Sequence, residues 1–446
     1  MPVVPAGPRY QSWGRYPRVA RQDVLQIVWR CDVPRWDTLD RSVLPFGQGR
    51  SYGDSCLNEG GVLLDASGLR RFISFDHDHG ILACEAGVTL AEILAVTLPR
   101  GWILPVIPGT KFVSVGGAIA NDIHGKNHHR AGSFGCHVRN LELLRSSGER
   151  MTCSPESHSD LFAATVGGLG LTGLILSAEL QLARVGTALL EVERIRFGQL
   201  NEFFEISEES DATCEHTVAW IDCLAGGRKL GRGVFHRANH VQQTVPAGVR
   251  TRGTVALSVP FYAPRVLLNR YTMKAFNTCY YGGQFTTTRK RLTPYERFFF
   301  PLDSVRNWNR VYGRPGFLQY QCVVPPRVGR DAIREILERT ARAGRGSFLA
   351  VLKQFGQRAS PGLLSFPRPG LTLALDFPFQ GRPTLALCDD LDAVVAQAGG
   401  AVYPAKDARM SPEHFARYYP TCDDFLKHMD PRFSSSFWRR VTGATD

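Results

Sequence analysis

The sequence predicts an α+β protein with two domains, and three observations lead to this prediction. The chain has 446 residues, 43% of them hydrophobic and 21% charged, which is long enough to bury two hydrophobic cores. Residues 40–185 are rich in glycine and in short apolar runs. Beyond about residue 190 the runs become longer and more aromatic, so we expect a domain boundary near residue 186.

The first region, residues 40–185, is expected to form short strands separated by turns, with one helix. Runs such as GVLLDAS and LILSAELQLA have the length and composition of short strands. The helix is predicted over 89–101, TLAEILAVTLPRG, because its apolar residues recur at helical spacing. Pro99 and Gly101 are expected to end it.

The second region, residues 186–400, is expected to form a sheet backed by helices. Residues 329–344 and 387–400 each carry an apolar stripe at helical spacing and close on glycine. Strand-like runs such as GFLQYQCVVPP alternate with them, which is the order of an α+β domain. From residue 401 the sequence returns to a texture of loops and short helices.

The composition points to an anionic partner. The formal net charge is +12, and the positive residues are spread along the chain instead of forming a basic block. We therefore expect no nucleic-acid partner, and a substrate phosphate or an anionic membrane surface explains the charge.

The cysteines and the N-terminus predict a cytoplasmic protein. The eleven cysteines are odd in number and lack a C-x-x-C motif, so we expect reduced thiols instead of a disulfide framework. The first residues lack the pattern of a signal peptide, and there is no run of about eighteen apolar residues.

A glycine-rich turn, PFGQGRSYGDSCLN at 45–58, follows an apolar strand. Its amide groups are able to converge on an oxygen-rich group. The third glycine, Gly53, is out of register with the dinucleotide fingerprint, and no helix is expected after it. The turn therefore argues against a Rossmann site.

A second glycine-rich block, residues 114–135, also contains His124, His128 and His129, and His137 follows it closely. The spacing lacks the helical pair and carboxylate of a zinc motif, so no metal site is predicted. Two readings remain: a surface loop with solvated imidazoles, or a backbone surface pressed against a large flat ligand.

Seven segments carry a family resemblance that runs in order through nearly the whole chain: GRSYGD, PVIPGT, VGGAIANDIHGKNHHRAGSFG, GLGLTG, FLQYQ, ALDFP and YPAKDAR. The chain resembles the flavoproteins of the vanillyl-alcohol-oxidase type, and within them the flavin subunits that oxidise a polyprenylphosphoryl ribose. The resemblance implies a two-domain fold of the PCMH type. Residues 1–185 would form the FAD-binding domain, 186–400 an α+β substrate domain, and 401–446 a C-terminal segment completing the FAD domain.

The resemblance implies noncovalent FAD. Related sugar and alditol oxidases bond the flavin to a histidine where this chain has Arg50, and a guanidinium cannot form that bond. The implied cofactor-binding residues are Gly47, Gln48, Gly49, Arg50, Ser51, Tyr52, Gly53, Gly109, Thr110, Val113, Ser114, Gly116, Gly117, Asn121, Ile123, His124, Gly173, Ile175, Tyr403 and Ala405. His128, His129 and His137 are interpreted as loop packing.

The candidates for catalysis are Lys406, Tyr52 and His124. Oxidation of a secondary alcohol needs a group that takes the hydroxyl proton, and burial lowers the pKa of a lysine into a useful range. The alternative role for Lys406 is to bind the substrate phosphate. The residues expected to bind substrate are Lys126, Gln319, Gln321, Lys353, Thr372 and Lys406.

Gln319 and Gln321 alternate along one strand, so both amides are expected on the same face. That face either binds a sugar or is a solvated sheet surface. Some mycobacterial family members have a cysteine where this chain has Ala374, so a thiol there is not required for turnover.

The implied reaction is oxidation of the 2′-hydroxyl of polyprenylphosphoryl-β-D-ribofuranose, the first half of an epimerisation for cell-envelope arabinan. An NAD(P)H-dependent short-chain reductase would complete it. The aromatic residues of 260–320 would form either a lip for the prenyl tail or core packing. With the basic charge they suggest a peripheral place on an anionic inner-membrane face, on the cytoplasmic or the periplasmic side.

Two rival functions stay open at this point. One is an FAD oxidase of free sugars, alditols or aldonolactones that uses oxygen, against which Arg50 speaks. The other is a non-catalytic flavin- or lipid-binding subunit, against which the candidate tyrosine, lysines and glutamines speak.

Overall fold

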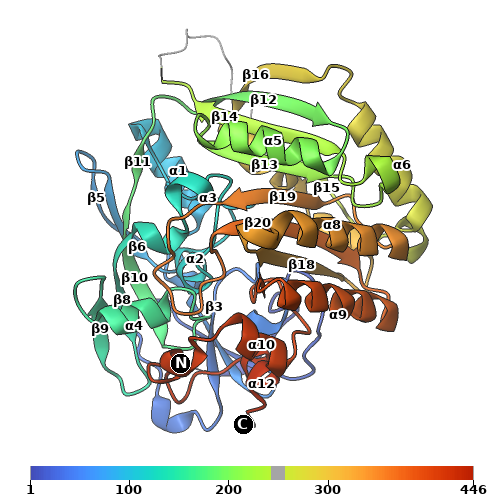
Figure 1. Cartoon of the computed structure of the whole chain (residues 1–446). Coiled ribbons are helices and arrows are strands. Elements are labelled where there is room, and N and C mark those ends of the chain that lie inside the picture. Colours follow the sequence, from blue (N-terminus) through green and yellow to red (C-terminus); the bar gives the residue numbers. More distant parts are fainter. Residues whose placement is uncertain (1, 243–256, 445–446) are drawn as a thin grey trace.

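The structure is a computed structural model that describes residues 2–242 and 257–444 (Figure 1). Its core consists of two smaller sheets from the first part of the chain and one large sheet from the middle part. In Figure 1 the large sheet and its helices lie at the upper right, and the second sheet, with β5, β6 and β10, lies at the left.

The first sheet pairs strands far apart in the sequence and presents the first glycine-rich turn. Its order is β1 (Val4–Pro5), β2 (Asp23–Gln26), β4 (Val62–Asp65) and β3 (Val43–Phe46). The last three strands run parallel, and the glycine-rich turn begins at the end of β3. Apolar side chains on both sides of β4 are fully buried, as expected for a parallel strand.

The second sheet is antiparallel and carries the remaining loops of the FAD side. Its order is β5 (Phe72–Asp76), β6 (Ile81–Glu85), β10 (Leu174–Gln181), β8 (Val138–Leu144) and β9 (Arg150–Cys153). The accompanying elements are α1 (Leu90–Thr97), β7 (Trp102–Ile103), α2 (Val115–Ala120), α3 (His128–Ala131), α4 (Ser159–Thr165) and β11 (Ala183–Arg184).

Helix α1 lies within the range predicted for it. Thr89 and Glu92 form a reciprocal capping box at its start, and a short 3-10 turn leads to Gly101 with φ of 78°. Helix α3 departs from the sequence analysis, which predicts no helix in the histidine-bearing block, and so does helix α2. Ser114 caps this helix by accepting a hydrogen bond from the amide of Gly117.

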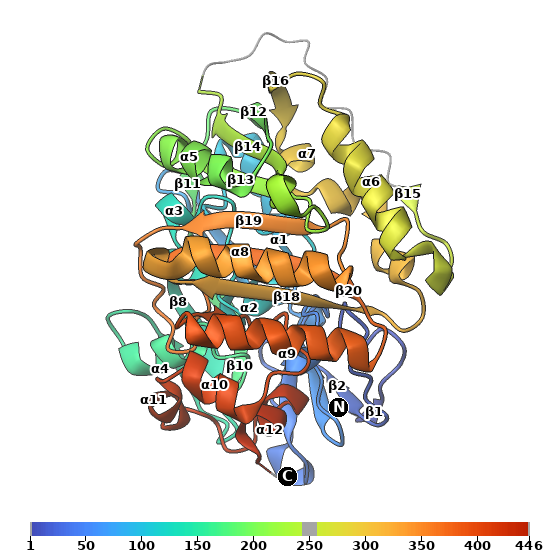
Figure 2. The same cartoon turned by 45° about the vertical axis from the view of Figure 1, so that its right-hand side comes forward.

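The large sheet has eight strands, in the order β16, β12, β14, β13, β19, β20, β18 and β21. Their bounds are Thr288–Pro294, Leu189–Phe197, Gly233–His240, His216–Ile221, Ala350–Phe355, Gly370–Pro378, Phe317–Val324 and Ala401–Val402. Helices α5 (Leu200–Asp211), α8 (Pro326–Ala343) and α9 (Arg382–Gln397) cover one face (Figure 2). The two amphipathic helices predicted over 329–344 and 387–400 overlap α8 and α9.

The C-terminal segment connects the large sheet to the first part of the chain. Its strand β21 pairs with β18, so residues 401–402 belong to the large sheet. Helices α10 (Pro412–Tyr418), α11 (Cys422–Leu426) and α12 (Ser436–Thr442) follow. Arg440 of α12 forms an ion pair with Asp54, with 2.7 Å between Nη2 and Oδ1, and Phe433 bridges to Val43.

One further group of elements lies along an outer edge of the large sheet (Figure 2). It comprises β15 (Leu257–Ser258), α6 (Arg270–Gly282), α7 (Tyr295–Phe299) and β17 (Val305–Arg306), and β15 pairs in parallel with β17. In the described residues, no helix is both long and apolar enough to cross a membrane.

Candidate active site

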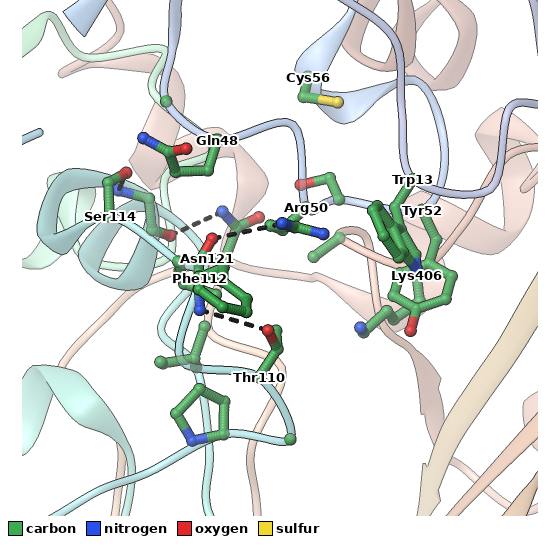
Figure 3. Close-up of a pocket in the computed structure, with 18 of the residues that line it drawn as sticks. Trp13, Gln48, Arg50, Tyr52, Cys56, Thr110, Phe112, Ser114, Asn121 and Lys406 are labelled. Atoms are coloured by element: carbon green, nitrogen blue, oxygen red, sulfur yellow. Dashed lines mark hydrogen bonds between the residues drawn. The ribbon is translucent and has the colours of Figure 1, made fainter. Parts of the chain in front are cut away.

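A single cavity of about 680 Å³ lies between the glycine-rich loops and the large sheet. Its walls come from the first sheet, the second sheet, β18, β19, β20 and the segment after β21. Figure 3 shows one part of it, with Gln48, Ser114 and Asn121 on one side and Trp13, Tyr52 and Lys406 on the other. Arg50 lies between the two groups in this view.

The first wall is made of backbone. The amide groups of residues 47–51 have no hydrogen-bond acceptor within the described part of the chain, and all five residues line the cavity. Gly49 has φ of 58°, and an added Cβ would lie 2.8 Å from the carbonyl oxygen of Gln11. A turn of consecutive unpaired amides is an anion-binding concavity.

The second wall is the stretch around α2. Asn121 donates its side-chain amide to the carbonyl of Gly117 at 2.8 Å, and Tyr403 donates its hydroxyl to the carbonyl of Asn121 at 2.7 Å. The first bond lies within the loop, and the second joins the loop to the segment after β21. The stretch around α2 is therefore held in place and faces the cavity. It is not a solvated surface loop.

The structure gathers the residues that the sequence singled out. Of the predicted cofactor-binding and substrate-binding residues, all but one line this cavity. The exception is Gly53, which packs on the backbone of Asp407, where any Cβ would overlap the carbonyl oxygen. Gly53 therefore holds the first loop against the C-terminal segment instead of facing the cavity.

Three lysines project into the cavity from different elements, and each has a lowered pKa. Burial lowers the pKa of Lys126, Lys353 and Lys406 to about 7. Lys353 lowers the pKa of the other two further, while Asp376 raises that of Lys406. The Nζ of Lys406 lies 3.8 Å from the centre of the Tyr52 ring.

Asp376 is the residue that sequence reasoning missed. It is fully buried in β20, and its carboxylate accepts hydrogen bonds from Gln319 Nε2 at 2.6 Å and from the Tyr312 hydroxyl at 3.2 Å. Burial raises its pKa to about 7, and the nearby Lys406 counteracts this. The ALDFP motif contained it, but only the fold brings it beside the lysine.

His124 is held from both ring nitrogens. Lys353 Nζ lies 3.1 Å from Nδ1, and the side-chain amide nitrogen of Gln321 lies 2.9 Å from Nε2. Burial first, and then the charge of Lys353, keeps the pKa of His124 well below its ordinary value. The imidazole is therefore neutral near pH 7. The side-chain amide of Gln321 donates to Thr372 Oγ1 at 3.2 Å.

Tyr52 is a weaker candidate for a base than the sequence suggested. Burial, followed by the charge of Asp376, raises the pKa of its hydroxyl well above 10. Its ring packs edge-on against Phe317 with 5.4 Å between centroids. Tyr52 is thus suited to position Lys406 and a bound sugar instead of accepting a proton.

Arg50 is held between two aromatic residues, Trp13 and Phe112, which were not predicted as site residues from the sequence. Its guanidinium lies 4.3 Å from the centre of the Trp13 ring and 5.6 Å from that of Phe112. Its Nε donates to the carbonyl of Phe112 at 3.3 Å. Cys56 also lines the cavity, but burial raises the pKa of its thiol to about 12.

This lining fits FAD. The unpaired amides of 47–51 suit the diphosphate, and the walls around Ile123 and Ile175 are apolar enough for a flat ring system. The cavity is lined by residues of each glycine-rich loop and by Lys406. The residue beside the second glycine is Arg50, which forms no bond to a flavin carbon, so these residues would hold the cofactor noncovalently.

Comparison with known proteins agrees with this geometry. Residues 36–154 match the FAD binding domain family. The chain is 37% identical to decaprenylphosphoryl-beta-D-ribose oxidase of Mycolicibacterium smegmatis, over 97% of each chain. It is 35% identical to a Streptomyces coelicolor protein named "Uncharacterized protein in mprA 5'region", over 79% of this chain and all of that one. Cytokinin dehydrogenase 4 of Arabidopsis thaliana is 30% identical over 35% of this chain and 31% of its own length.

Proposed function

The chain belongs to the decaprenylphosphoryl-β-D-ribose oxidase family of FAD-dependent oxidoreductases, and from this premise we propose that it oxidises the 2′-hydroxyl of a polyprenylphosphoryl-β-D-ribofuranose to the ketone. The observation that carries the proposal is the group of buried lysines that shares one cavity with the unpaired amides, with Asp376 buried near Lys406. Bound FAD would supply the acceptor for the carbinol hydride.

Lys406 is the proposed base. With its pKa lowered to about 7, a substantial fraction of its amino groups is unprotonated at neutral pH, so Nζ is able to take the hydroxyl proton. The negative charge of Asp376 raises the pKa of Lys406 and so opposes part of the lowering caused by burial. A lysine whose pKa is near the working pH is partly unprotonated and is still basic enough to accept a proton from the hydroxyl group.

The remaining polar groups would bind and orient the sugar. Gln321 and Lys353 fix the neutral His124, while Gln319 is held by Asp376. These contacts pre-set the rotamers that a sugar would meet, which lowers the entropic cost of orienting it. Lys126 lies in the same wall and donates to the carbonyl of Phe298, so its ammonium form suits the substrate phosphate.

The cavity mouth supports an amphiphilic substrate. Val305 and Arg306 of β17 line the cavity, and β17 pairs with the exposed strand β15. From β15 to the start of α6 runs an apolar lip, which we define as the exposed side chains of Leu257, Phe261, Tyr262, Val266, Leu267 and Tyr271. A prenyl chain leaving the mouth would meet this lip.

The lip also supports peripheral docking on an anionic membrane surface. Strand β16 lies at the edge of the large sheet and exposes Arg289, Lys290 and Arg291. Exposed apolar side chains together with basic ones are the features by which proteins bind anionic lipid surfaces. The aromatic residues of 260–320 therefore fall into two groups. Those of the lip are exposed, whereas Phe298, Phe299 and Phe300 pack in the core.

The ketone product would pass to a separate nicotinamide-dependent reductase. Reduction from the opposite face gives the arabinose epimer and needs a hydride donor. The match to the FAD binding domain family, residues 36–154, covers the first two glycine-rich loops that line the described active-site cavity. A second protein is therefore proposed as the source of that hydride.

The deciding experiment is anaerobic. The purified flavoprotein is mixed with a short-prenyl phosphoribose analogue, and the visible flavin absorbance is followed, with free ribose and alditols in parallel. Bleaching by the phosphoribose alone supports the proposal. Bleaching by the free sugars would instead favour a sugar oxidase, and no bleaching with any of them a non-catalytic binding subunit.

A further inference from the structure

A second, smaller pocket lies outside the active site. It has a volume of about 420 Å³ and is lined by Arg15, Tyr16, Arg18, Arg314, Pro315 and Phe379. None of these residues lines the active-site cavity. Half of the lining is arginine, so we refer to this feature as the arginine pocket.

Arg15 is a buried charge without a counter-charge. Its side chain belongs to a residue only 8% exposed, and Nη2 donates to the carbonyls of Asn309 and Gly313, each at 2.8 Å. Its Nε is buried and has no hydrogen-bond partner. In the described residues no carboxylate forms an ion pair with it, which is an unfavourable state for a buried guanidinium.

The neighbouring charges add to this imbalance. Burial lowers the pKa of Arg15, and the positive charges of Arg18 and Arg310 lower it further. Arg18 and Arg314 are exposed, and Arg18 donates to the carbonyl of Arg314 at 2.6 Å. None of these four arginines pairs with a carboxylate in the part of the chain that the structure describes. Together they favour an anion in the pocket.

The arginine pocket adjoins the apolar lip. The guanidinium of Arg15 lies 4.6 Å from the centre of the Tyr262 ring, and that of Arg310 lies 5.7 Å from it. Arg310 also donates to the carbonyls of Val259 and Pro260, at 3.1 and 3.0 Å. A molecule bound here would therefore present an anion to the arginines and have an apolar surface beside it.

We propose that the arginine pocket binds the phosphate of an anionic phospholipid headgroup, whose acyl chains lie along the apolar lip. This inference rests on the membrane docking proposed above and adds a discrete lipid site to it. Such a site would set the orientation of the protein, with the cavity mouth turned to the membrane from which the substrate comes. A planar guanidinium cluster is well matched to phosphate oxygens.

The test is flotation of the FAD-loaded protein with vesicles of phosphatidylglycerol and phosphatidylcholine, compared with phosphatidylcholine alone. The test variant is Arg18→Glu with Arg314→Glu, which leaves the buried Arg15 in place. The matched control is Arg327→Glu with Arg417→Glu, two exposed arginines at the start of α8 and in α10 that change the net charge equally. FAD content and thermal midpoint verify that both variants fold.

We expect the wild type and the control to float with phosphatidylglycerol, and the test variant to lose at least about tenfold in apparent affinity. Equal flotation of all three proteins would overturn the headgroup site while leaving the docking surface standing. Failure of the wild type to float would overturn both, whereas flavin bleaching by the soluble analogue would still test the reaction separately. Saturable binding of inorganic phosphate, lost in the test variant, with no dependence on phosphatidylglycerol would overturn the assignment to a lipid.

Discussion

The two long walls of the active-site cavity are built from different materials. The wall at residues 47–51 is backbone, with unpaired amides and a glycine at φ of 58°. The other wall is side chain, where Lys353 of β19 and Lys406 of the C-terminal segment line the cavity and the fully buried Asp376 of β20 lies near Lys406 without lining it. The backbone wall depends on local conformation, and the side-chain wall depends on how distant elements pack.

This contrast teaches where each property of the site comes from. A backbone anion site needs only that a short turn keep its shape, so one substitution at Gly49 is able to destroy it. The pKa values of the other wall come from burial and from neighbouring charges, so each residue there tunes the others. The two walls should therefore fail separately when mutated.

The largest effect is expected from Lys406→Met. Loss of the base should slow anaerobic flavin reduction by roughly a thousandfold, within the usual range for general base catalysis, while FAD content stays at the level of the wild type. Stopped-flow absorbance measures the rate. Lys427→Met, an exposed lysine of the C-terminal segment, is the control and should change nothing. A normal rate for Lys406→Met would exclude it as the base and leave it as a phosphate ligand.

The second-largest effect is expected from a substitution in the backbone wall at residues 47–51. Gly49→Val forces a β-branched residue to φ of 58° and onto Gln11, so FAD content of the purified protein should fall at least about tenfold. Gly148→Val is the matched control, because Gly148 has φ of 86° in open space away from the cavity. It should lose stability to a similar extent yet retain FAD. Equal loss of FAD in both variants would mean that general unfolding, and not the anion site, is responsible.

A pH profile tests whether Asp376 sets the pKa of Lys406. Because Lys406 must be unprotonated to accept a proton, the reduction rate should fall as the pH drops through about 7. Asp376→Asn removes the charge that raises the pKa of Lys406, so this limb should move to lower pH by roughly one unit. Thr384→Ser, a buried polar change in α9 away from the cavity, should leave the limb in place. A shift of the limb to higher pH in Asp376→Asn would contradict the proposed coupling.

The smallest effect is expected from Ala374→Cys. The change adds one sulfur atom to the cavity lining, so the reduction rate should stay within about threefold of the wild type. Loss of the reduction rate on treatment with thiol reagents should appear only in the variant. Cys56 of the cavity lining has its pKa raised to about 12, so its thiolate is scarce, and the exposed Cys31 and Cys279 do not line the cavity. Protection of the new cysteine by substrate analogue, read by mass spectrometry, checks that it faces the sugar. Rapid labelling of Cys56 in the wild type would contradict the raised pKa of its thiol.

Much of the fold and of the cofactor side was predictable from the sequence. The strands and helices follow local periodicity, as α1 with its capping box and α8 with its apolar stripe show. The glycine-rich loops were identified because glycine conformations are local properties. Helix α2 was missed because its six residues include two glycines and are too few for a helical period to stand out.

The sequence by itself determined the α+β class, the glycine turn that lines the FAD side and the absence of histidine at position 50, because each depends on residues close together in the chain. Only the tertiary structure decided that Asp376 lies near Lys406, that the surroundings of Tyr52 raise the pKa of its hydroxyl, and that Gly53 packs on Asp407. It also gathered Arg15, Arg18, Arg310 and Arg314 from two segments almost 300 residues apart, with a bond from Arg15 spanning 298 positions. Burial and electrostatic coupling depend on residues that are close in space but distant in the sequence, so no local sequence pattern predicts them.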